Sequence, residues 1–262
     1  MKDQLLLSYH QKGSGEDIVL LPGMLATTNF WKVIQKKLST KYKVTSLDLL
    51  GFGLSPKPDN IDYSYQDHLE SLNNTLTHLN IQKFTLVGHS MGGLIALNYA
   101  KAYPNKVKKL FIISPPLFTT PKEASQNINA YSGLPKILLE GIIAQIACKI
   151  FCQTLRPLTA LILMPFLFKN LDKQIAYDSL LHTYNSYYKN RINIIENKNN
   201  FTNFQKTKIP LTIIYGENDS RIIKKNLTLL SKNSHIKIKS HPNLTHQLPL
   251  ENPEIILNLI DS

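Results

Sequence analysis

A serine with a glycine two positions before it and another two positions after it is the feature of this chain best suited to chemistry. It lies in the motif Gly-His-Ser-Met-Gly at residues 88–92. A β-type run over 84–87 precedes the motif and a helical pattern over 91–102 follows it, so Ser90 is expected on a sharp strand-to-helix turn. Such a turn exposes the hydroxyl at the edge of a sheet, and we therefore predict Ser90 as a nucleophile. Nucleotide-binding turns carry G-x-G-x-x-G or G-K-[ST], and the sequence here has neither pattern.

The residues next to Ser90 fit this turn. Neighbouring segments crowd the positions of Gly88 and Gly92, so that only a very small residue fits at either. His89 flanks the nucleophile, and its side chain is expected to point away from the attacking oxygen. His68 and His78 belong to a helical pattern over 65–79 and are interpreted as histidines on a helix surface.

A general base is needed because a serine hydroxyl is a weak nucleophile near neutral pH. On a turn of this kind the partners follow in the order acid, then histidine. His246, in a loop just before the final helix, is the predicted base. His241, close behind the last strand, is the alternative.

An acid must orient that base, and it should follow the end of a strand. Asp219 comes directly after the strand-like run 211–215 and is the predicted acid, with Glu217 as its competitor. Another strand end carries Ser114, which is not acidic, and this favours Asp219. The structural alternative for Asp219 is that it caps a helix starting near Arg221.

Two backbone N–H groups should stabilise the negative charge that develops on a carbonyl oxygen under attack. Met91, the residue after the nucleophile, is the first predicted donor. The second is expected in the loop 21–25, where Gly23 permits a turn and Met24 supplies the N–H.

Together these residues resemble the α/β-hydrolase superfamily, and within it the single-domain, cap-bearing carboxylesterase and lipase-like branch. The segment 48–55 is similar to that family's D-x-x-G-x-G-x-S turn, which is structural. The family often has His-Gly where this chain has Pro22-Gly23, a change that removes a side chain but no backbone donor. The resemblance implies a mainly parallel sheet flanked by helices, with no metal or organic cofactor. Dehalogenases and epoxide hydrolases would have Asp in place of Ser90.

The elements that must position these residues alternate between strand and helix up to residue 114 and again from 209. Alternation at this spacing indicates βαβ units and a parallel sheet. Between them, the segment 115–208 has helical patterns and no clear strand. We predict an α/β-hydrolase core over 1–114 and 209–262, with 115–208 as an inserted helical cap.

The composition of the insert is the best indication of substrate. It is rich in large apolar residues, and its eleven Lys and Arg against five Asp and Glu give it a charge of +6. An apolar acyl group is therefore expected, although the same residues would also form a cap core. The predicted substrate-binding residues are Leu25, Ile142, Ile146 and Met164.

Length and composition limit the remaining possibilities. The 262 residues carry 30 Lys and Arg and 18 Asp and Glu, a net charge of +12, which codon bias or an anionic partner would explain. No nucleic-acid-binding pattern is present, contact with a membrane surface stays open, and the oligomeric state is undetermined. The first residues lack a signal-peptide pattern, which predicts a cytoplasmic protein.

Cys148 and Cys152, one helical turn apart without a second pair, predict neither a disulfide framework nor a zinc site. They are interpreted as small buried apolar residues.

The predicted function is hydrolysis of carboxylic esters through an acyl-enzyme intermediate, with an apolar acyl group in a small-molecule ester substrate. The alternatives are a thioesterase, a C–C bond or amide hydrolase on the same scaffold, a perhydrolase, and a non-catalytic binding member of the fold.

Overall fold

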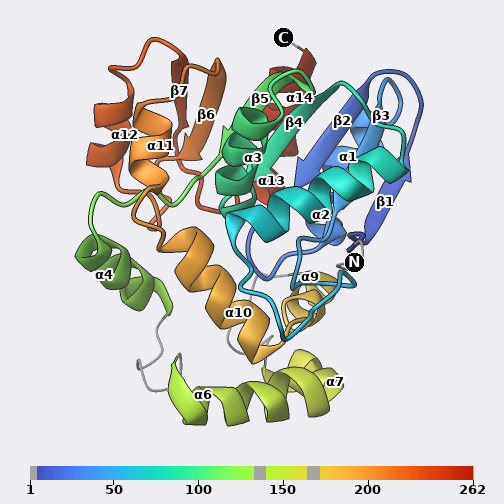
Figure 1. Cartoon of the computed structure of the whole chain (residues 1–262), viewed down its shortest axis with the longest axis vertical. Helices are drawn as coiled ribbons and strands as arrows, with labels where there is room; N and C mark the ends of the chain where they lie inside the picture. The colour runs from blue at the N-terminus through green and yellow to red at the C-terminus, as the bar shows by residue number, and fades with distance from the viewer. Residues whose placement is uncertain (1–4, 133–139, 164–171, 262) are drawn as a thin grey trace.

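A computed structural model describes residues 5–132, 140–163 and 172–261 (Figure 1). Within these ranges seven strands form one sheet in the order β1-β3-β2-β4-β5-β6-β7. Neighbouring strands are parallel except at one edge, where β1 pairs antiparallel with β3. The strands are β1 (Tyr9–Lys12), β2 (Asp17–Leu21), β3 (Lys43–Leu47), β4 (Phe84–His89), β5 (Val107–Ile113), β6 (Leu211–Gly216) and β7 (Ile236–His241).

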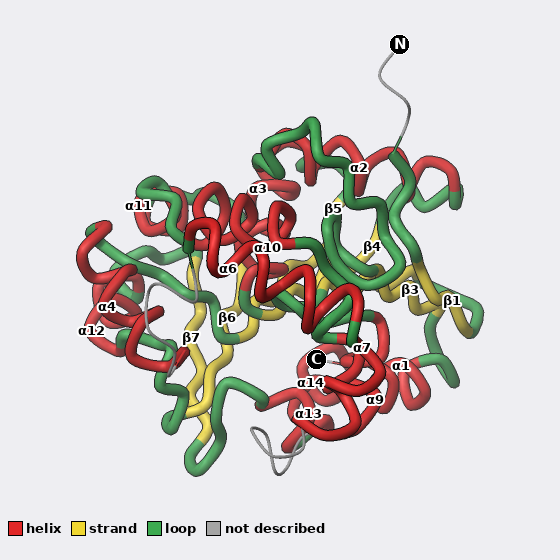
Figure 2. Tube along the Cα trace, turned by 90° about the horizontal axis from the view of Figure 1, so that it is seen from below, coloured by secondary structure: helices red, strands yellow, loops and turns green. Residues whose placement is uncertain are grey.

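Alternate residues of the central strands point to opposite faces of the sheet and contribute to two hydrophobic cores, one on each face. In β5, for example, Leu110 and Ile112 join one core, and Phe111 and Ile113 join the other. Helices cover both faces, which is why the strands are apolar on both sides. Figure 2 shows the strands of the sheet with helices on either side of them.

The helices of the core divide according to the face that they cover. The first core is closed by α2 (Tyr65–His78), α3 (Met91–Ala102), α11 (Asn200–Gln205) and α12 (Lys224–Leu230). The second is closed by the 3-10 helix η1 (Thr28–Trp31), α1 (Lys32–Leu38), α13 (Leu248–Glu251) and α14 (Pro253–Asp261). The predicted fold class, an α/β-hydrolase fold with a mainly parallel sheet flanked by helices, is confirmed.

Two local features differ from the sequence predictions. The edge strand β1 was not predicted, because its exposed residues show no apolar pattern. His68 was predicted on a helix surface, and this is wrong. Its side chain is 1% exposed, and its Nε2 lies 2.7 Å from Oδ1 of Asn190, 122 residues further along the chain. A partner that remote leaves no trace in the periodicity of α2.

The regular elements that the structure describes in the segment 115–208 are all helices, and none of its described residues belongs to a strand of the sheet. In Figure 1 its outer helices α6 and α7 lie on the far side of α10 from the sheet. Its helices are α4 (Pro121–Ser132), α6 (Gly141–Cys148), the π-helical η2 (Lys149–Thr154), α7 (Arg156–Leu158), the π-helical η3 (Thr159–Leu163), α9 (Lys173–Asp178), α10 (Tyr184–Asn190), the π-helical η4 (Arg191–Ile195) and α11.

This segment is anchored on the loops that follow the carboxyl ends of β2 and β3. The carboxylate of Asp178 accepts hydrogen bonds from Thr27 and Asn29, after β2. The Ser186 hydroxyl donates to the carbonyl oxygen of Gly51, after β3, at 2.8 Å. In a parallel α/β sheet, ligands bind beyond the carboxyl ends of the strands, so the segment is attached at the edge of the sheet where a ligand site is expected. Across the described ranges, no helix has both the length and the apolar character needed to cross a bilayer.

Candidate active site

Ser90 occupies the turn between β4 and α3 with a backbone conformation that non-glycine residues rarely adopt. Its φ is 52° and its ψ is −119°. Such strain persists only where the surroundings impose it. Here the Ser90 N–H donates to the Ile113 carbonyl oxygen at 2.8 Å, which ties the turn to the end of β5. The side chain is therefore held at the rim of the sheet, as expected for a nucleophile on such a turn.

The two glycines of the motif lie where a side chain would collide with backbone. A Cβ on Gly88 would lie 2.5 Å from the carbonyl oxygen of Gly92, and a Cβ on Gly92 would lie 2.4 Å from that of Pro22. Strand β4 thus packs directly on α3, and α3 on the loop after β2. The crowding that the sequence predicted at these positions is the structural reason for both glycines.

The side chains of His246 and Asp219 are joined across 27 residues. Nδ1 of His246 lies 2.8 Å from Oδ2 of Asp219, and both residues are buried. A carboxylate can only accept, so Nδ1 carries the proton and Nε2 presents its lone pair. Within the described part of the chain, that Nε2 is buried and has no hydrogen-bond partner. The pair is therefore a base whose free nitrogen is available to another group.

Burial sets the protonation of this pair. Burial lowers the pKa of His246, the charge of Arg221 lowers it further, and the bond to Asp219 only partly opposes them. Burial alone would raise the pKa of Asp219, but the bonds from His246 and from the Arg221 N–H outweigh it and hold that pKa below its ordinary value. Asp219 is thus an anion and His246 a neutral base near pH 7. The alternative that Asp219 caps a helix starting near Arg221 is wrong, because α12 begins at Lys224 and its N-cap is Ile223. Oδ1 of Asp219 instead accepts the Arg221 N–H at 2.9 Å within the turn before that helix.

The competing residues lie elsewhere. Glu217 is exposed and accepts a hydrogen bond from the Ser240 hydroxyl at 2.8 Å. His241 ends β7, where its carbonyl oxygen accepts the Glu217 N–H. The carboxylate bonded to a histidine in this region is that of Asp219.

His89 connects the serine turn to the His246 loop. Its Nε2 donates to the carbonyl oxygen of His246 at 2.8 Å, and the two rings lie 4.8 Å apart between centroids. On its other side the ring stacks on Phe30 at 4.7 Å. Because the next residue along the chain is Ser90, these contacts bring Ser90 and His246 to the same edge of the sheet. Complete burial lowers the pKa of His89 well below its ordinary value, so the ring is neutral.

The loop after β2 lies against Ser90. A Cβ on Gly23 would lie 3.1 Å from Cβ of Ser90 and 3.2 Å from Nδ1 of His89. Leu25 turns this loop with a φ of 65°, and the Ala26 N–H bonds back to Gly23 at 3.3 Å. Met24 therefore lies next to the residue that contacts Ser90. Met91 is the first residue of α3, where helix N–H groups have no partner within the helix.

The D-x-x-G-x-G-x-S segment forms a structural turn. Oδ1 of Asp48 accepts the Thr28 N–H at 2.7 Å and Oδ2 accepts the Leu54 N–H at 2.8 Å, while the Ser55 hydroxyl donates to the Asp48 carbonyl oxygen at 2.6 Å. Gly53 has a φ of 57°, and a Cβ there would lie 2.2 Å from Oδ2 of Asp48. Both oxygen atoms of the buried Asp48 carboxylate thus accept backbone N–H groups, and these bonds order the loops beside the site.

Three of the four predicted substrate-binding residues lie among the described residues, and their exposure differs. Leu25 is half-buried in the loop beside Ser90 and packs on the first core. Ile142 and Ile146, on α6, are 75% and 54% exposed. Met164 lies outside the described residues. The assignment of these four residues to a pocket stays a prediction.

A surface hollow lies far from this edge. Its volume is about 360 Å³, and it is lined by residues at the amino ends of β5, β6 and β7, among them Lys108, Pro210 and His235. Ser90 lies beyond the carboxyl end of β4, at the opposite edge of the sheet. The hollow is therefore unrelated to the serine turn.

Comparison with known proteins agrees with the fold. A family described as the alpha/beta hydrolase fold matches residues 18–241. The match covers the sheet from β2 to β7 together with the inserted segment. The chain therefore belongs to the α/β-hydrolase family.

Relatives of known sequence match a limited part of the chain. It is 32% identical over 128 residues to the probable lysophospholipase BODYGUARD 4 of Arabidopsis thaliana, covering 48% of this chain and 31% of that protein. It is 36% identical over 102 residues to the uncharacterized protein Rv2715 of Mycobacterium tuberculosis, covering 39% and 30%. The matched region thus spans less than a third of either relative.

Solved structures match nearly the whole chain at low identity. An esterase from Exiguobacterium antarcticum superposes with a TM-score of 0.74 at 20% identity, covering 99% of this chain and 98% of that one. A thermophilic esterase from Thermogutta terrifontis gives a TM-score of 0.72 at 17% identity, covering 97% and 91%. At such identities the likeness establishes the shared fold.

Proposed function

We propose that this protein is a serine hydrolase that cleaves carboxylic esters through an acyl-enzyme intermediate. Ser90 is the nucleophile, His246 the general base and Asp219 the residue that orients it. The observation that carries the proposal is the buried Asp219–His246 hydrogen bond, which leaves Nε2 of the imidazole unprotonated next to the serine turn. The esterases and probable lysophospholipases among its relatives support ester hydrolysis.

The reaction would proceed in two halves. The Ser90 oxygen bonds to the ester carbonyl carbon while its proton passes to Nε2 of His246. The N–H groups of Met24 and Met91 stabilise the oxyanion until the C–O bond breaks and the imidazolium returns the proton to the departing alcohol. Water then attacks the acyl-enzyme, giving its proton to His246, and the carboxylic acid leaves as Ser90 is regenerated.

The acyl group is proposed to be apolar, with residues 115–208 acting as a cap. The anchoring of this segment on the loops after β2 and β3 supports a position over the site. Its described helices expose nine large apolar side chains, more than scattered surface residues would give. The exposed residues are Ile142, Ile143, Ile146, Ile150, Phe151, Leu155, Leu158, Leu161 and Ile162. Such a surface fits a lipophilic substrate better than a small polar one.

A thioester is the second candidate substrate, because the same relay would cleave it. The segment 115–208 carries a charge of +6, which would favour an anionic carrier or head group. Comparing kcat/KM for matched oxygen esters and acyl thioesters separates the two. A higher value for the thioesters would replace the ester assignment.

Labelling with a fluorophosphonate probe tests the nucleophile. Wild-type protein should form a covalent adduct at Ser90, and Ser90→Ala should form none while remaining folded. Ester hydrolysis should disappear with the adduct. If wild-type protein is not labelled, or if Ser90→Ala is labelled as fast, the chain is a non-catalytic member of the family or has another nucleophile. A series of p-nitrophenyl esters tests the acyl group, where a steep preference for acetate over octanoate would contradict an apolar pocket.

A further inference from the structure

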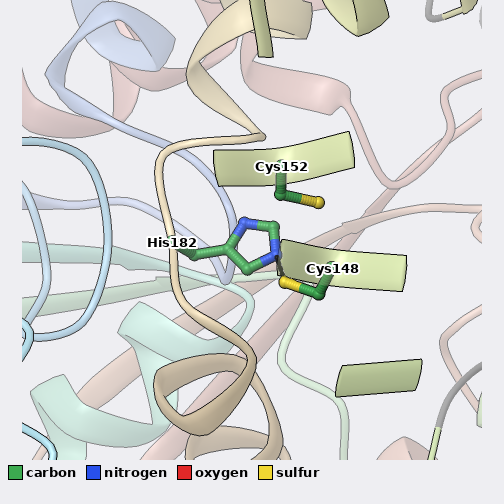
Figure 3. Close-up of side chains that lie close together, drawn as sticks. All are labelled: Cys148, Cys152 and His182. Atoms are coloured by element: carbon green, nitrogen blue, oxygen red, sulfur yellow. Dashed lines mark hydrogen bonds between the residues drawn. The ribbon is translucent and has the colours of Figure 1, made fainter. Parts of the chain in front are cut away.

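The two cysteines of the chain meet a histidine in the inserted segment, well away from the serine turn. Cys148 ends α6, Cys152 lies in the π-helical η2, and His182 lies in the turn before α10. One donor atom from each residue lies within 4.8 Å of the other two. In Figure 3 the imidazole and both sulfur atoms converge on one small region.

The histidine presents a free lone pair to the sulfurs. Nδ1 of His182 lies 2.9 Å from the carbonyl oxygen of Ser179, which can only accept, so Nδ1 carries the proton. Nε2 is then unprotonated, and it lies 3.6 Å from Sγ of Cys148. A second nitrogen bonded to a backbone carbonyl is the usual arrangement for a metal-binding histidine, because it sets both the tautomer and the ring orientation.

The chemistry of the three groups selects the ligand. Two thiolates and an imidazole are soft donors that suit Zn²⁺ or Cu⁺ and disfavour Mg²⁺ or Ca²⁺. With Zn²⁺, two thiolates and a neutral imidazole would form a cluster without net charge, which lowers the cost of burying the ion. His182 is buried and both cysteines are half-buried, so the fourth position of a tetrahedral ion would face water.

The backbone around the cluster joins two separate parts of the fold. The helix containing Cys148 continues into a π-helical stretch, a feature often found at functional sites. The backbone of His182 forms an isolated bridge to Phe52, in the turn that Asp48 orders. A metal at this cluster would therefore fasten α6 and η2, which carry the two cysteines, to a turn that is itself attached to the core.

We propose that Cys148, Cys152 and His182 bind one Zn²⁺ ion, which fastens the outer helices of residues 115–208 to the core. The sequence predicted no metal site, because the two cysteines have no second pair of ligands near them along the chain. His182 is 34 residues from Cys148, and only the folding of the inserted segment unites them.

Cobalt substitution tests the site in the reduced full-length protein. One equivalent of Co²⁺ should produce thiolate-to-metal charge-transfer absorption and intense tetrahedral d–d bands, and one equivalent of Zn²⁺ should abolish both. His182→Gln should keep the charge-transfer band but weaken Zn²⁺ affinity by at least about 100-fold, beyond the loss expected for an outer partner. Cys148→Ser should lose about half of that band. His78→Gln, an exposed histidine on α2, should bind like wild type.

Thiol protection provides a readout that does not depend on variants. Cys148 and Cys152 are the only cysteines, so Zn²⁺ should slow the reaction of both thiols with a disulfide reagent and raise the melting temperature. The proposal is overturned if tetrahedral Co²⁺ does not bind stoichiometrically, if His182→Gln binds Zn²⁺ as tightly as wild type, or if Zn²⁺ leaves both thiols equally reactive. Binding of Cu⁺ but not Zn²⁺ would overturn the assignment to zinc.

Discussion

His89 donates a hydrogen bond from Nε2 to the backbone carbonyl oxygen of His246 at 2.8 Å, across 157 residues of sequence. The residue before the proposed nucleophile thus holds the backbone of the proposed base. Both side chains are buried, so this bond is not exchanged for one to bulk water.

Replacing His89 tests this connection. His89→Phe keeps a ring to stack on Phe30 but leaves the His246 carbonyl oxygen without its donor, so we expect a loss of about 1–3 kcal/mol in the free energy of unfolding. We also expect a lower kcat, since the imidazole is held less firmly, while the fluorophosphonate adduct stays on Ser90. Urea unfolding and ester kinetics measure the two effects. Recovery of part of the loss in His89→Gln, whose amide can donate, would support the hydrogen bond; equal values in both variants would contradict it.

The carboxylate of Asp219 should matter far more than the one two residues before it. Asp219→Asn can still accept the Arg221 N–H but no longer requires the proton to be on Nδ1 of His246, so kcat should fall by roughly 10³- to 10⁴-fold. Glu217→Gln is the matched control, because Glu217 is exposed and bonds only to Ser240 among the described contacts of its side chain. Steady-state kinetics on one ester decides the matter. Comparable losses in both variants would remove Asp219 from its proposed role.

The pH dependence of kcat/KM should reflect the buried base. Burial lowers the pKa of His246 below 6.5, so the neutral form persists to lower pH than in an exposed histidine. Activity should therefore be fully present near pH 7 and be lost as pH falls through that lowered pKa. The measurement is kcat/KM for an uncharged ester from about pH 4 to about pH 8. An inflection at or above 6.5 would be inconsistent with the environment of His246.

A methyl group at Gly23 should impair catalysis through the oxyanion loop. The added carbon of Gly23→Ala would lie 3.1 Å from Cβ of Ser90, so the loop carrying Met24 must shift by a few tenths of an ångström. Small misplacements at a reacting centre cost on the order of 10- to 100-fold in rate. We expect that loss in kcat with little change in melting temperature. An unchanged kcat would argue against an oxyanion donor in this loop.

His68 should make stability depend on pH. Burial lowers its pKa to about 4 in the folded chain, against 6.5 as the ordinary value. The unfolded chain then binds the proton more readily between these values, so the free energy of unfolding falls as pH is lowered through this window, by up to about 3 kcal/mol. His68→Gln should flatten this dependence in urea titrations at several pH values, whereas His78→Gln on the exposed face of α2 should not. If the free energy of unfolding depends on pH in the same way for wild type, His68→Gln and His78→Gln, the expectation is wrong.

The sequence by itself determined what depends on local order. The turn at Ser90, the two crowded glycines, the parallel sheet and the limits of α3 all follow from residues within a few positions of one another. Apolar residues that repeat every two positions in a strand, or every 3.6 positions in a helix, indicate which face of the element is buried. A glycine can indicate a position where a Cβ does not fit. Asp219 and His246 could be proposed as partners because each follows the end of a strand, and the structure joins their side chains by a hydrogen bond.

Only the tertiary structure decided the contacts between remote residues. It buried His68 against Asn190, joined His89 to the backbone of His246 and brought His182 to the two cysteines. It also left Ile142 exposed on α6. None of these contacts has a local signature, because each forms between side chains or backbone groups that meet only when separate elements pack. Periodicity identifies the buried face of an element, but the packing of the whole chain decides what covers that face.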